Sequence, residues 1–312
     1  MKKILTLLTL TVTLSSLFAQ KQNLSFNLQK GNTYYQTLTS LSVINQTLGS
    51  QIMEIKVNMT CRVSYKVNEI NNNQYNLDVK YESLSMKMFL PNNMTMEFSS
   101  ENKEETSDQM SAIFSKVMKA LTQTPFQMEL TKKGKIISIK NIDAIFEKMF
   151  SSFPSMSPEQ KAQIKSQIGQ SFGPDQFKSN FEMMMAIYPE QPVAIGEKWK
   201  TESISNALMS LKASSEFQLI NQEGELNTIK GKSQIVVVDK NAFVNTNGIE
   251  MRFDMTGEQV TELKVNKRTG WVEAGKLTQS LKGKAITKDS PQTPGGMAIP
   301  MDIVTTMNLA GK

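Results

Sequence analysis

Residues 53–68 read MEIKVNMTCRVSYKVN, and in this stretch every odd position is apolar and every even position is polar. An unbroken period of two places all the apolar side chains on one face of a β-strand. The stretch is longer than the strands of most globular proteins, and a strand of this length twists and bends. It therefore predicts a long, curved antiparallel sheet with one apolar face.

Alternating segments continue on both sides of this strand. Upstream, one starts at Leu24 and a second covers 34–43. Downstream, the apolar positions change phase between 75–81 and 84–90, which predicts a β-bulge at Glu82 and Ser83. Further strands are expected at 94–98, 212–221, 226–238, 249–266, 271–281 and 299–309, with a hairpin turn at 267–270.

Helical spacing replaces the alternation in the middle of the chain. Helices are expected at 110–121 with a cap at Ser107 or Asp108, at 143–150, after Ser157 and at 177–188, with a hairpin at 126–139. The order predicts an α+β fold of long curved antiparallel β-sheets, half-barrel or clam-like, with a central helical insertion. The expected parts are a signal peptide at 1–19, β-halves at 20–106 and 189–312, and the insertion at 107–188. The two β-halves and the insertion are expected to form one integrated domain.

The N-terminus has the pattern of an export signal. Lys2 and Lys3 precede an apolar run at 4–18, and Ala19 stands where a signal peptidase would cut. No cysteine follows the run, so the mature protein is not expected to be a lipoprotein. We therefore expect a periplasmic or secreted protein whose mature chain has no transmembrane helix.

The residue inventory disfavours common catalytic chemistry. The chain has no histidine, and Cys61 is its one cysteine, so the usual triads and most metal sites have no ligands or bases. Gly231-Lys232-Ser233 lacks the earlier glycine of a phosphate-binding loop. We expect no enzymatic activity, cofactor or metal, although a Ser–Lys dyad or a carboxylate pair stays open. The net charge of +6 comes with no basic block, so nucleic-acid binding is not expected.

Methionine is unusually frequent, with 21 residues. Methionine fills irregular gaps in a core, and it also forms adaptable surfaces for apolar ligands. The helix expected at 177–188 has a wide apolar arc that is either simple core or a lid over a cavity. The candidate ligand-binding residues on this arc are Phe177, Phe181, Met184, Met185 and Tyr188.

Short turn and strand-edge patterns spread over the chain carry a resemblance to a known family. They are Leu28-Gln29-Lys30-Gly31 with Tyr34 and Gln46, Gly134-Lys135-Ile136, Pro192-Val193 with Gly196-Glu197-Lys198-Trp199, and Thr269-Gly270-Trp271 with Ile299-Pro300-Met301. On these residues the chain resembles an uncharacterised family of exported, β-rich proteins of Gram-negative bacteria. The resemblance implies export and a β-rich fold, and it implies no activity, substrate or site residue.

Two functional hypotheses follow from these observations. The first is a non-enzymatic protein of the cell envelope that binds an apolar, lipid-like or amphiphilic ligand between curved sheets and helices. The alternative is a structural or protein-interaction component of the envelope without a small ligand, which predicts an exposed apolar patch or sheet edge. A membrane β-barrel would show the same alternation, but the helical insertion disfavours it.

Overall fold

The computed structural model describes residues 21–101, 109–151, 157–159, 161–162, 174–206, 209–246, 249–291 and 293–311. Three expectations lie outside these residues: the signal peptide at 1–19, the helix cap at Ser107 or Asp108, and most of the helix after Ser157.

Thirteen strands form one sheet, in which every pairing is antiparallel. The strands are β1 (Thr33–Leu48), β2 (Gln51–Asn71), β3 (Gln74–Leu90), β4 (Met94–Ser99), β5 (Phe126–Thr131), β6 (Ile136–Lys140), β7 (Lys198–Asn206), β8 (Ser210–Glu223), β9 (Leu226–Val237), β10 (Val244–Thr246), β11 (Ile249–Asn266), β12 (Val272–Thr287) and β13 (Ala298–Gly311). The helices are α1 (Gln109–Gln123), α2 (Ile142–Ser151) and α4 (Pro174–Met185), with a 3-10 turn, η1, at Pro91–Asn93.

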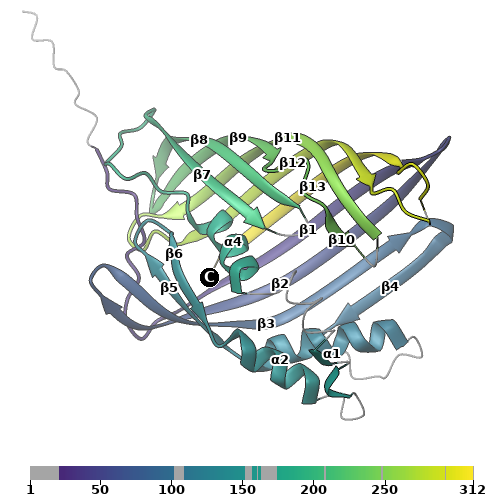
Figure 1. Cartoon of the computed structure of the whole chain (residues 1–312). Helices are drawn as coiled ribbons and strands as arrows, with labels where there is room; N and C mark the ends of the chain where they lie inside the picture. The colour runs from purple at the N-terminus through teal and green to yellow at the C-terminus, as the bar shows by residue number, and fades with distance from the viewer. Residues whose placement is uncertain are drawn as a thin grey trace, which may run out of the picture.

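The sheet is open and strongly curved (Figure 1). Its main path runs β6-β5-β3-β2-β1-β13-β12-β11-β9-β8-β7, while β4 pairs with β3 and β10 pairs with β11. The pairing of β1 with β13 joins the N-terminal strands to the C-terminal strands, so both halves share one sheet. The expectation of a β-rich α+β fold with long curved antiparallel strands is confirmed in this form.

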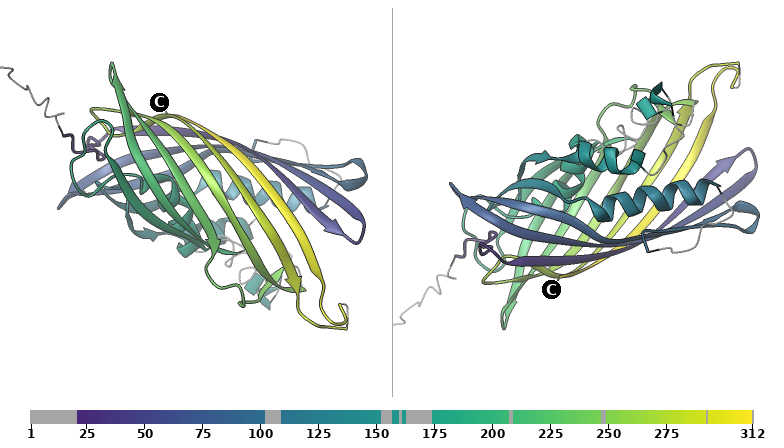
Figure 2. Two further views of the ribbon diagram at one scale, coloured as in Figure 1. Left: turned by 90° about the horizontal axis from the view of Figure 1, so that it is seen from above. Right: turned by 90° about the horizontal axis from the view of Figure 1, so that it is seen from below.

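The helices lie on the concave side of the sheet (Figure 2). All three follow β4 and precede β7 in the chain. α1 packs on β3 and β4, while α4 packs on both β6 and β7, the two edge strands of the main path. α4 therefore fills the gap between the edges at one end of the sheet (Figure 1).

The register separates charge from apolar side chains across the sheet. The paired residues of β1, β2, β7–β9 and β11–β13 that face the concave side include no lysine, arginine, aspartate or glutamate. The charged residues of these paired strands lie on the convex side, where ion pairs cross neighbouring strands. They include Lys87–Glu97, Lys198–Glu216, Lys212–Glu202, Lys230–Glu262 and Lys282–Asp302.

Two local predictions meet different outcomes. The β-bulge at Glu82 and Ser83 is confirmed, because the pairing of β2 with β3 shifts between Arg62 and Val63, opposite these residues. The strand predicted from Leu24 is wrong. Residues 23–29 form no strand, although Leu24, Phe26 and Leu28 are buried. The alternation there reflects burial of one side of an extended segment that has no neighbouring strand.

Candidate functional site

The concave face has two regions that differ in how they are covered. At the closed end, the N-terminal segment (residues 21–29) and helix α4 pack on the inward side chains of the strands, and α2 contributes side chains to the same core. At the open end, towards the turn between β1 and β2, α1 packs on β3 and β4 and buries Phe98, and most of the other inward side chains of β1 to β4 and β13 are only partly covered by described residues.

The closed end is a solid aromatic core. The ring of Tyr65 stands edge-on to Trp271 with centroids 5.1 Å apart, and it also contacts Phe181. Phe126 packs against Phe177 and Phe181 at 5.4 and 5.7 Å. Such pairs add to the free energy of burial of large side chains.

The five candidate ligand-binding residues meet in this core. Phe177, Phe181, Met185 and Tyr188 are each at most 5% exposed, and the partly buried Met184 packs against the same cluster. The Tyr188 hydroxyl donates a hydrogen bond to the backbone oxygen of Gly270. The structure thus places these side chains among protein atoms at the closed end. A role for them in ligand binding stays a prediction.

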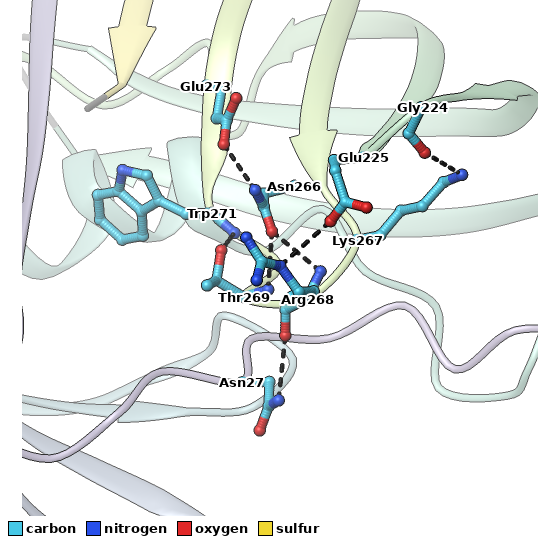
Figure 3. Close-up of polar contacts among 9 residues, drawn as sticks. All are labelled: Asn27, Gly224, Glu225, Asn266, Lys267, Arg268, Thr269, Trp271 and Glu273. Atoms are coloured by element: carbon cyan, nitrogen blue, oxygen red, sulfur yellow. Dashed lines mark hydrogen bonds and ion pairs between the residues drawn. The ribbon is translucent and has the colours of Figure 1, made fainter.

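The N-terminal segment is tied to the turn between β11 and β12 (Figure 3). The Asn27 side chain donates to the Arg268 carbonyl over 3.0 Å, and the Asn27 backbone N–H donates to the Thr269 carbonyl over 2.8 Å. Within the turn, the Asn266 carboxamide oxygen accepts from the backbone N–H groups of Arg268 and Thr269. Residues 23–29 have no neighbouring strand, and these hydrogen bonds satisfy backbone groups that strand pairing would otherwise satisfy.

Two glycines allow the backbones to approach at this end. Gly270 has φ +68°, and a Cβ there would overlap the backbone oxygen of Ser25. Gly134 has φ +88°, and a Cβ there would overlap the backbone oxygen of Met185 at the end of α4. A left-handed backbone conformation and close packing both require glycine at these positions.

Most of the residues that carried the family resemblance gather at the closed end. The segment ending at Gly31, the turn at Gly134 and the turn at Gly270 all contact this core or the N-terminal segment. The Trp271 indole N–H donates to the Tyr35 carbonyl over 2.9 Å. Val193 pairs with Gln22 of the N-terminal segment, and Trp199 belongs to the same core, whereas Gln46 and Met301 pair at the opposite end.

The open end presents a half-buried apolar floor, which we call the Met-lined trough. Its inward side chains come from β1, β2, β3, β4 and β13, and each is intermediate in exposure. They are Ile44, Met53, Ile55, Val57, Met59, Met86, Met88, Met96, Met301 and Ile303. A second core on β8–β13 buries residues such as Met255 and Leu281, and Met301 and Ile303 of the floor pack against it. Sequence reasoning noted the high methionine content but did not place these methionines on one surface.

A row of polar side chains crosses the concave face between the two ends. Registered pairings place one polar residue on each of seven neighbouring strands, and we call this set the polar row. Its members are Ser42, Thr305, Gln279, Gln259, Ser233, Ser215 and Thr201. Hydrogen bonds within and beside the row join Ser42 to Thr305, Gln279 to Gln259, Gln259 to Thr261 and Ser215 to Ser233 at 2.7–3.3 Å.

Burial favours the neutral forms of three titratable side chains on the concave face. Burial raises the pKa of the Cys61 thiol to about 11, although a backbone hydrogen bond at Leu38 opposes the shift. Burial also raises the pKa of Tyr65 and of Tyr81. A thiol with a raised pKa is a poor nucleophile at neutral pH. The described residues contain no cluster of three or more Cys, Asp or Glu that suits a metal ion.

Similarity to solved structures is remote. The chain matches a lipovitellin structure on lipid–protein interactions at 8% identity and a TM-score of 0.49, covering 92% of this chain and a quarter (25%) of that one. It matches an outer membrane channel from Pseudomonas putida F1 at 6% identity and a TM-score of 0.24, covering 92% and 98%. A protein of the DUF1329 family from Desulfovibrio piger matches at 7% identity and a TM-score of 0.13, covering 88% and 83%.

Curated proteins give no match to this chain. Among the described residues, no helix has the length and apolar character needed to cross a membrane. The family assignment comes from the sequence between β2 and the start of β12. Residues 72–272 match the model of DUF6263, a family of unknown function, and the chain belongs to that family.

Proposed function

We propose that this protein binds an apolar or amphiphilic ligand in the Met-lined trough and that it acts without catalysing a reaction. The observation that carries the proposal is the row of half-buried apolar side chains on the inner face at the open end. Strands β1 and β2 continue from the solid core into this surface, so the apolar face extends beyond the packing that covers it.

The physical basis is the free energy of covering apolar surface. Each Å² of apolar surface removed from water contributes about 25 cal/mol. A ligand that covers the trough floor therefore gains binding free energy from the buried area alone. Methionine side chains have three rotatable bonds and adapt to ligands of different shape. Met53, Met88 and Met96 therefore suit the acyl or isoprenoid parts of a lipid-like molecule.

The absence of catalysis is part of the proposal. The chain has no histidine, and its single thiol is held neutral by burial at Cys61. A cell-envelope location after export is proposed on the N-terminal pattern of Lys2, Lys3 and the apolar run at 4–18. A periplasmic or extracellular carrier or receptor for lipid-like molecules fits all of these features.

The first test is to purify the chain from Gln20 under native conditions, extract it with solvent and identify bound molecules by mass spectrometry. A lipid-like molecule at near-stoichiometric amount is the expected result. A preparation that carries nothing above background, and that also fails to bind a neutral apolar dye, would contradict the proposal. That outcome would favour a structural or protein-interaction role.

A matched pair of variants locates the site. Val57→Lys places a charge on the trough floor, where it is expected to weaken dye binding at least tenfold because a charge is costly in an apolar site. Asn58→Lys places the same charge on the adjacent outward position and is expected to leave binding unchanged. Equal effects of the two variants would place the ligand elsewhere, and the α4 residues Phe177 and Phe181 would be examined next.

A further inference from the structure

We infer that the polar row recognises the head of the ligand and that the ligand is a neutral, hydroxyl-bearing amphiphile of the acylglycerol type. The inference rests on the proposed function, because it assigns the ligand's chain to the Met-lined trough and its head to the polar row. Its basis is the position of the row, the lack of charge around it and its hydrogen-bonding capacity.

The row lies directly beside the trough. Ser42 and Thr305 are paired across β1 and β13, and the next inward pair towards the open end is Ile44 with Ile303. Two residues along a strand correspond to about 7 Å, and the six from Ser42 to Leu48 correspond to roughly 20 Å. A head placed at the row therefore has a long apolar floor beside it for an extended chain.

The strands that carry the row supply no partner for a charged head. No charged side chain faces inward from the paired residues of the seven strands that form the row. On these strands the charged neighbours of the row, such as Glu258 beside Gln259, lie at adjacent positions that face outward. A carboxylate or phosphate at the row would lose water without gaining a partner of opposite charge, which is strongly unfavourable.

The row retains hydrogen-bonding groups for a neutral head. Each glutamine carboxamide offers two donors and an acceptor oxygen. The Gln279 Nε2 donates to Gln259 Oε1, and Gln259 Nε2 donates to Thr261 Oγ1, both over 3.3 Å. One N–H on each amide and the Gln279 oxygen remain without a partner among the described residues. Both side chains are half-buried, so a hydroxyl group can reach them from the concave side.

The test measures displacement of the neutral dye N-phenyl-1-naphthylamine from the purified chain by three competitors that share one acyl chain. 1-Monooleoylglycerol has hydroxyl groups, methyl oleate has none, and oleate carries a charge. We expect monooleoylglycerol to displace the dye at concentrations at least tenfold lower than either of the others. Equal displacement by all three, or strongest displacement by oleate, would overturn the inference even though dye binding would still support the proposed function.

Variants then test the residues themselves. The double variant Gln259→Leu/Gln279→Leu is expected to bind the dye as before but to lose most of the preference for monooleoylglycerol. Gln234→Leu, which removes an outward glutamine on β9, is the matched control and is expected to keep the preference. A preference retained in the double variant would refute the role of the row.

The competitor series on the unmodified chain decides the ligand class even if the double variant does not fold. Failure of the dye to bind the unmodified chain would instead overturn the proposed function, and this inference with it.

Discussion

The closed end and the open end of the concave face share strands but differ in packing. Strand β2 contributes Tyr65 to the closed end, where it is fully buried, and Val57 to the open end, where it is half-buried. Both residues belong to one unbroken apolar alternation. The difference comes from the partners, because the N-terminal segment and α4 pack on the closed end, while at the open end α1 covers only the part on β3 and β4 within the described residues. Alternation therefore determines which face is apolar, while the covering elements determine where that face becomes a core.

Cys61 marks the boundary between the two ends. It pairs with Leu38 on β1 and Leu84 on β3, and all three side chains are at most 9% exposed. The next inward residue of β2 towards the open end is Met59, which is half-buried. Cys61 thus provides a single chemical probe at the point where the core ends.

The largest expected effect comes from a matched pair of methionine truncations. Met128 on β5 is 1% exposed in the closed core, so Met128→Ala is expected to lower the free energy of unfolding by about 2–5 kcal/mol. Met88 on β3 is half-buried in the trough, so Met88→Ala is expected to cost about 1 kcal/mol or less. Urea unfolding of both variants measures the difference. Similar losses at the two sites would show that the trough is packed like a core.

A pair of tyrosine variants tests the polar groups of the closed core. The Tyr188 hydroxyl donates to the Gly270 oxygen, so Tyr188→Phe leaves a buried carbonyl unsatisfied and is expected to cost about 1–3 kcal/mol. The Tyr65 hydroxyl is buried without a hydrogen-bond partner among the described residues. Tyr65→Phe removes that unsatisfied group and is expected to be neutral or to stabilise by up to about 1 kcal/mol. The midpoint temperatures of thermal unfolding of the two variants should change in different directions or by clearly different amounts. Equal losses would argue that the two hydroxyl groups do not differ in hydrogen bonding.

Much of the sheet is predictable from local pattern. The alternation at 53–68 predicted a long curved strand and its apolar face, and the phase change predicted the bulge opposite Arg62 and Val63. The same logic failed at Leu24, Phe26 and Leu28, because alternation reports a buried side and does not reveal whether a neighbouring strand supplies hydrogen bonds.

The candidate site depends on information that alternation does not contain. The polar row exists only through the register of seven strands, some of which, such as β1 and β13, lie more than 250 residues apart in the chain. A serine or glutamine between apolar neighbours in one strand carries no sign of its partners on the next. The trough has the same inward pattern as the core, so the methionines at 86, 88 and 96 could not be assigned to either from sequence.

The effect of Cys61 on stability is absent at neutral pH and appears only in alkaline solution. Burial raises the pKa of the thiol to about 11, so the folded state keeps its proton in a range where the unfolded chain loses it. The free energy of unfolding should therefore be unaffected by this group at neutral pH and should fall as the pH rises from about 8.5 towards 11. Cys61→Ala should flatten that part of the pH profile, which chemical unfolding at a series of pH values measures.

The reactivity of the same thiol reports on the boundary between the two ends. At pH 8 the raised pKa lowers the thiolate fraction by about a hundredfold relative to an exposed cysteine, and burial hinders access further. Labelling of the native protein by a thiol-specific disulfide reagent should therefore be at least that much slower than labelling in urea. Fast labelling of the folded chain would show that the solid core ends before Cys61 and that the trough extends deeper into the sheet than Met59. A ligand seated in the trough should slow the labelling further if it reaches this layer, and should leave the rate unchanged if its head stops at the polar row.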